Sequence, residues 1–123
     1  MQENQNFITT YNKLNPEQKK AVDTIEGPVM VMAGPGTGKT QVLATRVAKI
    51  LQEQDQNPQN ILALTFTDAA AQNMRQRIVS LIGTQGYYVN IMTFHGFASE
   101  VISSYPEKFP IEKGSEPLSN FER

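Results

Sequence analysis

The chain contains no cysteine among its 123 residues, which excludes disulfide bonds and zinc sites built from thiolates. It also lacks a long apolar run. The longest uninterrupted one, residues 29–33, is far shorter than the roughly 20 residues that a membrane-spanning helix needs. The first ten residues are polar, without the basic and apolar segments of a secretory signal. We therefore expect a soluble, cytoplasmic protein with no membrane partner.

An excess of charge of one sign is missing as well. The chain has 11 Lys and Arg against 12 Asp and Glu, so its formal net charge is −1. A strongly basic surface, the usual electrostatic footprint of nucleic-acid binding, is not available here. Any case for DNA binding must therefore rest on particular residues. Hydrophobic residues make up 39% of the chain and charged residues 19%, which is enough for a packed core.

Apolar spacing predicts alternating helices and strands after a loosely ordered lead-in over residues 1–13. Short apolar runs predict strands over residues 29–33, 61–66 and 88–94. Helical spacing predicts helices over about residues 16–24, 39–52, 69–82 and 96–105. Asn15 and Gln18 have the residue types and spacing of a capping box. Strands that alternate with helices favour a three-layer α/β fold, in which a parallel sheet has flanking helices.

The strongest functional signal is a glycine-rich segment between an expected strand and an expected helix. It runs Ala33, Gly34, Pro35, Gly36, Thr37, Gly38, Lys39 and Thr40. It fits the phosphate-loop pattern except at its first position, where the pattern has glycine. The glycines let backbone N–H groups approach phosphate oxygens, and the following helix adds its positive end. An ordinary glycine-rich turn is the alternative, which the flanking strand and helix disfavour.

We expect the end of this segment to supply the catalytic side chains. Lys39 can bring its charge to the β- and γ-phosphates of ATP. The hydroxyl of Thr40 suits a Mg²⁺ ion that also binds phosphate oxygens. The pattern therefore predicts binding of ATP with Mg²⁺, although a phosphate loop alone does not specify the reaction.

Four blocks of the sequence resemble the UvrD/Rep/PcrA family of superfamily 1 DNA helicases, in the family's order. Residues 14–22 resemble its Q motif, 33–40 motif I, 62–75 motif Ia, and 91–97 the threonine–histidine block that follows. The resemblance implies a RecA-like motor domain whose first part spans residues 14–97. Residues 98–123 would then begin an inserted helical subdomain that is truncated, which makes the domain incomplete.

The resemblance implies an ATP-dependent DNA helicase or translocase that moves on single-stranded DNA. Its acidic motif and its second motor domain would come from the remainder of the helicase chain. For Gln18 the resemblance implies recognition of the adenine edge, although a capping role also accounts for this residue. Gln41 would complete the ATP site where family members often have an Arg that packs on the adenine.

The same resemblance implies contacts with single-stranded DNA from the ends of two strands. The residues concerned are Thr65, Phe66, Thr67, Thr93 and His95. Because ligands bind beyond the carboxyl ends of parallel strands, this position agrees with such a role. Taken without the resemblance, Phe66 is more typical of a core residue and His95 of a packing or capping residue.

Adjacent acidic residues are absent from the whole sequence. ATP hydrolysis in this class needs an acid that holds Mg²⁺, a residue that positions water and a cationic finger. We therefore expect the isolated chain to bind ATP without appreciable turnover. Two other functions remain open. One is a small P-loop kinase or NTPase that uses Asp68, and the other is a non-catalytic module that binds nucleotide or DNA.

Overall fold

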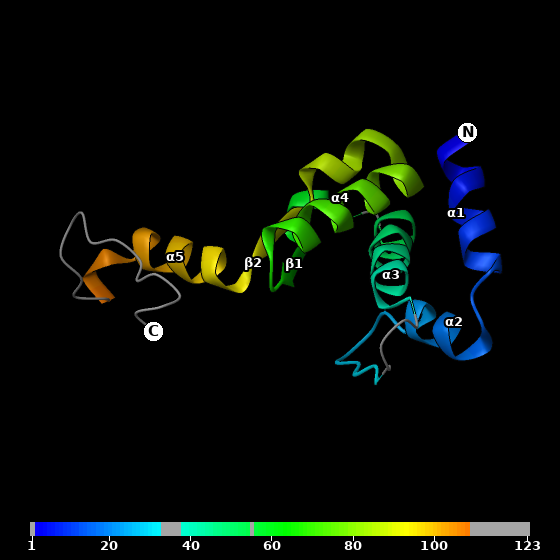
Figure 1. Cartoon of the computed structure of the whole chain (residues 1–123), viewed down its shortest axis with the longest axis horizontal. Helices are drawn as coiled ribbons and strands as arrows, with labels where there is room; N and C mark the ends of the chain where they lie inside the picture. The colour runs from blue at the N-terminus through cyan, green and yellow to red at the C-terminus, as the bar shows by residue number, and fades with distance from the viewer. Residues whose placement is uncertain (1, 33–37, 55, 109–123) are drawn as a thin grey trace.

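The computed structural model describes residues 2–32, 38–54 and 56–108. The main elements, in chain order, are α1 (Gln2–Asn12), α2 (Pro16–Asp23), α3 (Lys39–Glu53), β1 (Leu62–Thr65), α4 (Asp68–Ile82), β2 (Asn90–Thr93) and α5 (Phe94–Ser104). Short 3-10 helices lie at η1 (Pro58–Asn60), η2 (Gly83–Tyr88) and η3 (Pro106–Lys108). Figure 1 shows α1 to α4 gathered at one end, while α5 leaves β2 toward the other.

The loosely ordered lead-in predicted for residues 1–13 is wrong, since residues 2–12 form helix α1. Contacts distant in sequence stabilise this polar helix. Phe7 packs against the main core, and Tyr11 packs against a second apolar cluster. The amide nitrogen of Asn6 also donates to the carbonyl oxygen of Ser80 in α4 at 3.0 Å. Tertiary packing has therefore outweighed a weak local signal.

The next three helices begin and end close to the predicted positions. The capping box at the start of α2 is confirmed. The backbone N–H of Gln18 donates to Asn15 Oδ1 at 2.8 Å, and the backbone N–H of Asn15 donates to Gln18 Oε1 at 2.9 Å. Helices α3 and α4 supply most of the main core, which contains Ala44, Ala48, Leu51, Met74, Ile78, Leu81, Val89 and Ile91. A second cluster joins α2 to α3 through Leu14, Ala21, Val22 and Val42.

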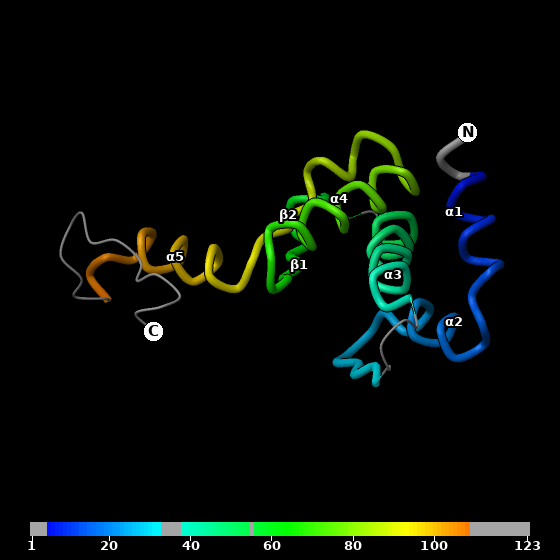
Figure 2. The backbone as a smooth tube through the Cα atoms, in the orientation of Figure 1, coloured from blue at the N-terminus to red at the C-terminus, as the bar shows by residue number. Residues whose placement is uncertain are grey.

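Strands β1 and β2 form a parallel pair, as the alternation of strands and helices predicts. Their register places Leu62 opposite Asn90 and Thr65 opposite Thr93. Helix α4 joins them and packs against both, as Figure 2 shows. This arrangement is one strand–helix–strand unit of an α/β fold, in which a single crossover helix packs on a two-stranded parallel sheet.

The strand predicted for residues 29–33 does not form over residues 29–32, while residue 33 lies outside the described residues. Met30 is 88% exposed and Met32 is 91% exposed, so this apolar segment is not buried. A strand needs a neighbouring ladder to pair its backbone groups. Within the described ranges, the two strands pair only with each other. The three-layer P-loop sheet is therefore not established, and a smaller α/β arrangement takes its place.

Helix α5 begins earlier than predicted, at Phe94 rather than near Gly96. The cause is Thr93, whose hydroxyl oxygen accepts from the backbone N–H of Gly96 at 2.9 Å and caps the helix. The strand expected over residues 88–94 is shortened to β2, because the cap assigns Phe94 to α5 and the 3-10 helix η2 includes Tyr88. No helix in the described part of the chain is long and apolar enough to cross a membrane.

Candidate functional site

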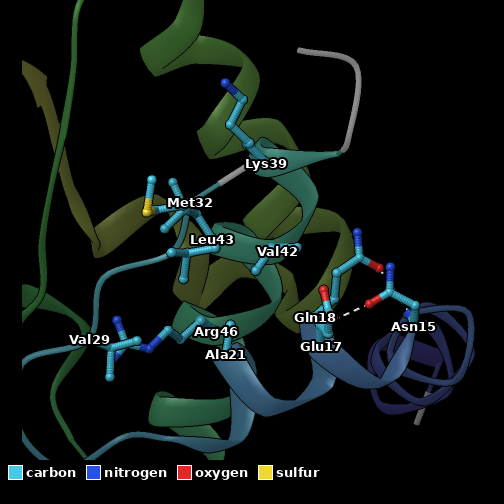
Figure 3. A pocket seen from close by; sticks show the side chains of 11 residues that line it. Asn15, Glu17, Gln18, Ala21, Val29, Met32, Lys39, Val42, Leu43 and Arg46 are labelled. Carbon is cyan, nitrogen blue, oxygen red and sulfur yellow. Dashed lines mark hydrogen bonds between the residues drawn. The ribbon is translucent and has the colours of Figure 1, made fainter. Parts of the chain in front are cut away.

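A cavity of about 420 Å³ lies between α2, α3 and the extended segment of residues 29–32, shown in Figure 3. Its lining is Asn15, Glu17, Gln18, Ala21, Val29, Val31, Met32, Lys39, Val42, Leu43 and Arg46. Two residues predicted to bind ATP, Gln18 and Lys39, thus belong to one cavity although they come from different helices. In Figure 3 the Lys39 side chain extends away from Gln18, so the two occupy separate ends of the site.

The end of the cavity near Lys39 lies at the N-terminus of helix α3. Gly38 precedes α3 with φ 74° and ψ 34°, a left-handed conformation that glycine adopts most easily. Among the residues that the structure describes, no side chain caps this helix. The first N–H groups of an α-helix have no acceptor within the helix, so the start of α3 carries uncapped donors and a positive partial charge. Lys39 is exposed, and Thr40 beside it is half-buried.

The rest of the predicted phosphate loop, which is Ala33, Gly34, Pro35, Gly36 and Thr37, lies outside the described residues. Within the described residues, no group of three or more His, Cys, Asp or Glu side chains is arranged to hold a metal ion. The predicted role of Thr40 at Mg²⁺ therefore stays a prediction.

The end of the cavity near Gln18 is set by the capping box. Its Oε1 atom accepts the Asn15 N–H at 2.9 Å. The Nε2 atom lies 3.9 Å from the point where a Cβ on Gly38 would stand. The Gln18 side chain can therefore cap α2 and, at the same time, lie beside the start of α3.

Arg46 is a cavity residue that the sequence reasoning missed. One of its terminal nitrogens donates to the carbonyl oxygen of Thr24 at 3.0 Å. Its Nε atom is buried and has no hydrogen-bond partner among the described residues. A buried donor without a partner costs free energy, and this N–H is too deeply buried to meet a ligand unless the side chain moves. The signal in the sequence is spacing, because Lys39, Val42 and Arg46 recur on one face of α3.

Gln41 is not brought to this cavity. It sits on the face of α3 toward α4, where its Oε1 atom accepts a short hydrogen bond from Nη1 of Arg77. Its backbone carbonyl oxygen also accepts from the hydroxyl of Thr45 at 2.6 Å. The ATP contact predicted for Gln41 therefore stays a prediction, and its side chain is engaged elsewhere in this structure.

The residues predicted to contact DNA meet at the carboxyl ends of β1 and β2. Thr65 and Thr93 are register partners, and Phe66 and Phe94 follow them directly. Phe66 is 88% exposed, so it is not the core residue that its apolar strand suggested. The centre of its ring lies 5.1 Å from the centre of the Phe94 ring, and Phe94 is also exposed. The sequence reasoning missed Phe94, because the pairing of the two rings depends on the strand register.

The threonines beside this aromatic pair already have hydrogen-bond partners. Thr67 Oγ1 accepts from the backbone N–H of Ala70 at 3.0 Å and caps α4, just as Thr93 caps α5. The hydroxyl of Thr65 donates to the carbonyl oxygen of Thr67 at 3.1 Å. His95 is exposed in the first turn of α5. These bonds fix the short loop that carries Phe66 and the start of α5, where Phe94 lies.

Comparison with known proteins gives one family. The model described as the UvrD/REP helicase N-terminal domain matches residues 14–121. A probable DNA helicase II homolog from Rickettsia conorii is 51% identical over 100 residues, which is 81% of this chain and 14% of that protein. The ATP-dependent DNA helicase PcrA of Staphylococcus aureus is 42% identical over 102 residues, which is 83% of this chain and 14% of that protein. The chain therefore spans a small part of the length of these relatives.

Proposed function

The chain belongs to the UvrD/REP helicase N-terminal domain family, and from this premise we propose that it is the ATP-binding segment of an ATP-dependent DNA helicase. The observation that carries the proposal is the position of Gln18 and Lys39 at two ends of one cavity, next to the uncapped start of α3. ATP has a polar base at one end and a charged triphosphate at the other. The cavity offers a matching group to each.

The triphosphate is bound at the start of α3. Lys39 supplies a positive charge, and the uncapped N–H groups of the first turn donate to phosphate oxygens. The segment from Ala33 to Thr37 wraps the phosphates, as its glycines and its position before the helix favour. Thr40 would hold Mg²⁺ through its hydroxyl, beside oxygens of the bound phosphates.

The base and ribose occupy the apolar part of the cavity. Val31, Val42 and Leu43 line it, and its volume falls within the roughly 300–1,000 Å³ of small-molecule sites. Gln18 reads the adenine edge, since its amide offers a donor and an acceptor. Arg46 also lines the cavity, and its guanidinium supplies donors for an acceptor of the base or ribose.

Single-stranded DNA runs over the carboxyl ends of β1 and β2. A base stacks on the exposed pair of Phe66 and Phe94, a contact that tolerates any sequence because every base has an aromatic face. Thr65, Thr67, Thr93 and His95 flank it with polar groups. With a net charge of −1, this chain gains little from release of counterions. The DNA contact of the isolated chain is therefore weak.

The isolated chain binds Mg²⁺–ATP but does not hydrolyse it appreciably, because the sequence has no pair of adjacent acids to complete the site. Asp68, the acid that a small kinase would need, opens α4 and does not line the cavity. Movement on DNA belongs to the longer protein that the relatives represent.

A calorimetric titration with Mg²⁺–ATP beside a phosphate-release assay, each with and without single-stranded DNA, tests this function. We expect saturable binding of ATP and no phosphate release above the buffer rate. Absence of any ATP binding to the folded chain would contradict the proposal. Phosphate release that DNA stimulates would show that the chain carries a complete hydrolytic site.

A further inference from the structure

Three side chains from three helices meet at the end of α2. Lys49 of α3 forms an ion pair with Asp23, at 2.6 Å between Nζ and Oδ1. The hydroxyl of Tyr11 in α1 donates to Asp23 Oδ2 at 2.7 Å. Both oxygens of one carboxylate are thus bound, each by a different helix. We refer to Tyr11, Asp23 and Lys49 as the three-helix latch.

The latch is an ionic contact with well-defined geometry. The side chain of Lys49 is only 18% exposed, and its ammonium lies 5.1 Å from the centre of the Tyr11 ring. The hydrogen bond from Lys49 lowers the pKa of Asp23, and the same bond raises the pKa of Lys49. The bond to Asp23 raises the pKa of Tyr11. Asp23 is therefore ionised at neutral pH, and its two hydrogen bonds belong to the stronger, charge-assisted class.

Asp23 stands on the same helix as Gln18. This helix has eight residues, with the capping box at its start and Asp23 at its end. Its other contacts with α3 are the apolar packing of Ala21, Val22 and Val42 and the hydrogen bond from Arg46 to the carbonyl oxygen of Thr24, just after the helix. The carboxylate of Asp23 adds two directional bonds to these contacts. The latch therefore helps to set where α2 lies along α3, and hence where Gln18 lies relative to Lys39.

We propose that Asp23 is a positioning residue of the nucleotide site, which holds Gln18 at the distance from Lys39 that ATP requires. The inference rests on the proposed function, because it takes Gln18 as the base contact and Lys39 as the phosphate contact. Asp23 does not line the cavity, so its proposed role is to position Gln18 and not to contact the ligand. Tyr11, the α1 residue of the latch, precedes residue 14, where the match to the family model begins.

The experiment compares two ligands on four variants of the whole chain. Inorganic tripolyphosphate reaches only the phosphate end of the site, whereas ATP needs both ends in register. Asp23→Asn removes the charge that holds Lys49, and Tyr11→Phe removes one hydrogen bond while keeping the ring. Glu53→Gln is the matched control. Glu53 also pairs with Lys49, at 3.4 Å, but it lies on α3 itself and links no second helix. Gln18→Ala removes the proposed base contact directly.

We expect Asp23→Asn to weaken binding of Mg²⁺–ATP roughly fivefold, with tripolyphosphate binding unchanged. Tyr11→Phe is expected to have a smaller effect in the same direction, and Glu53→Gln none on either ligand. Calorimetry gives the affinities, and circular dichroism shows that each variant is folded. If Asp23→Asn unfolds the chain, Tyr11→Phe carries the test, because it keeps both charges and the aromatic ring.

The outcomes separate this inference from the function beneath it. If Gln18→Ala weakens ATP selectively but a folded Asp23→Asn does not, the positioning role is wrong and the proposed function stands. Equal losses for ATP and tripolyphosphate in Asp23→Asn, or the same loss in Glu53→Gln, would reduce the latch to general stability and overturn the inference. If Gln18→Ala changes neither ligand, the proposed base contact itself fails.

Discussion

The helices that follow the strands and the helix that follows the glycine-rich segment begin in different ways. Helices α4 and α5 are each capped by a threonine hydroxyl, at 3.0 Å from Thr67 to the Ala70 N–H and at 2.9 Å from Thr93 to the Gly96 N–H. Helix α3 begins at Gly38, which has no side chain to do this. A good cap contributes about 1 kcal/mol to stability. Glycine at this position costs only roughly a few tenths of a kcal/mol relative to a capping side chain, and it leaves the first N–H groups of α3 without a side-chain acceptor among the described residues.

The side chains around these helix starts also differ: a charged residue stands at the uncapped start and aromatic residues stand at the capped ones. Lys39 stands exposed at the start of α3, where it adds a full charge to the uncapped donors. Phe66 and Phe94 stand beside the capped starts and form an exposed aromatic pair. One region suits a polyanion, and the other suits the flat face of a base. We therefore assign the proposed nucleotide contact to the start of α3 and the proposed DNA contact to the aromatic pair.

The largest effect is expected for Lys39→Ala. Loss of a charge-assisted contact of about 1.5–3 kcal/mol should weaken Mg²⁺–ATP binding by roughly 10- to 100-fold. Lys20→Ala is the matched control, since Lys20 is exposed on α2 and does not line the cavity. Calorimetry of the two variants decides the point. Similar affinities in both would mean that the phosphates do not bind at the start of α3.

Phe66→Ala is expected to act on the other region alone. Removal of one stacking partner should lower affinity for single-stranded DNA by roughly tenfold, while ATP affinity stays unchanged. Fluorescence anisotropy with a labelled oligothymidylate measures the DNA side. Because Phe66 is 88% exposed, the variant should stay folded. A collapse of the circular dichroism signal would instead make Phe66 a core residue.

Gly38→Ala tests the backbone geometry at the start of α3. The φ of 74° costs an alanine about 1.5 kcal/mol, which should appear as a lower free energy of unfolding in urea. Side-chain crowding does not contribute, since the nearest atom to an added Cβ is 3.9 Å away. Gly38→Asn should lose less, because asparagine tolerates the left-handed region better. Equal losses would place the cost outside the backbone.

The smallest effect is expected for Thr67→Ala, which removes the cap of α4. The free energy of unfolding should fall by about 1 kcal/mol, and Thr67→Ser should retain most of the stability because it keeps the hydroxyl. Nucleotide affinity should not change in either variant. A reduced ATP affinity in Thr67→Ala would show that the capped and uncapped helix starts are not independent.

Features that depend on neighbouring residues could be predicted from the sequence. The capping box at Asn15 and Gln18 follows from residue types three positions apart. The bounds of α3 and α4 follow from helical spacing and from good helix formers. The parallel pairing of β1 with β2 follows from their separation by a helix. Each of these is decided by local chemistry or by a rule of chain connection.

Features that depend on residues distant in the sequence could not be predicted from the sequence. Residues 29–32 are as apolar as β1, yet they form no strand, since pairing requires a neighbour and not composition alone. Helix α1 forms because Phe7 packs against the main core and Tyr11 bonds to Asp23 of α2, which the polar local sequence does not reveal. Phe94 and Arg46 joined their sites only through strand register and helix packing.

The most direct test of the central claim is the response of individual backbone amides to inorganic tripolyphosphate in a ¹⁵N–¹H correlation experiment. We predict that the amides of Lys39, Thr40 and Gln41 shift as the ligand is added. The amides of Ala70 and Gly96, already bonded to Thr67 and Thr93, should not shift. Equal shifts at all three helix starts, or none at α3, would contradict the account.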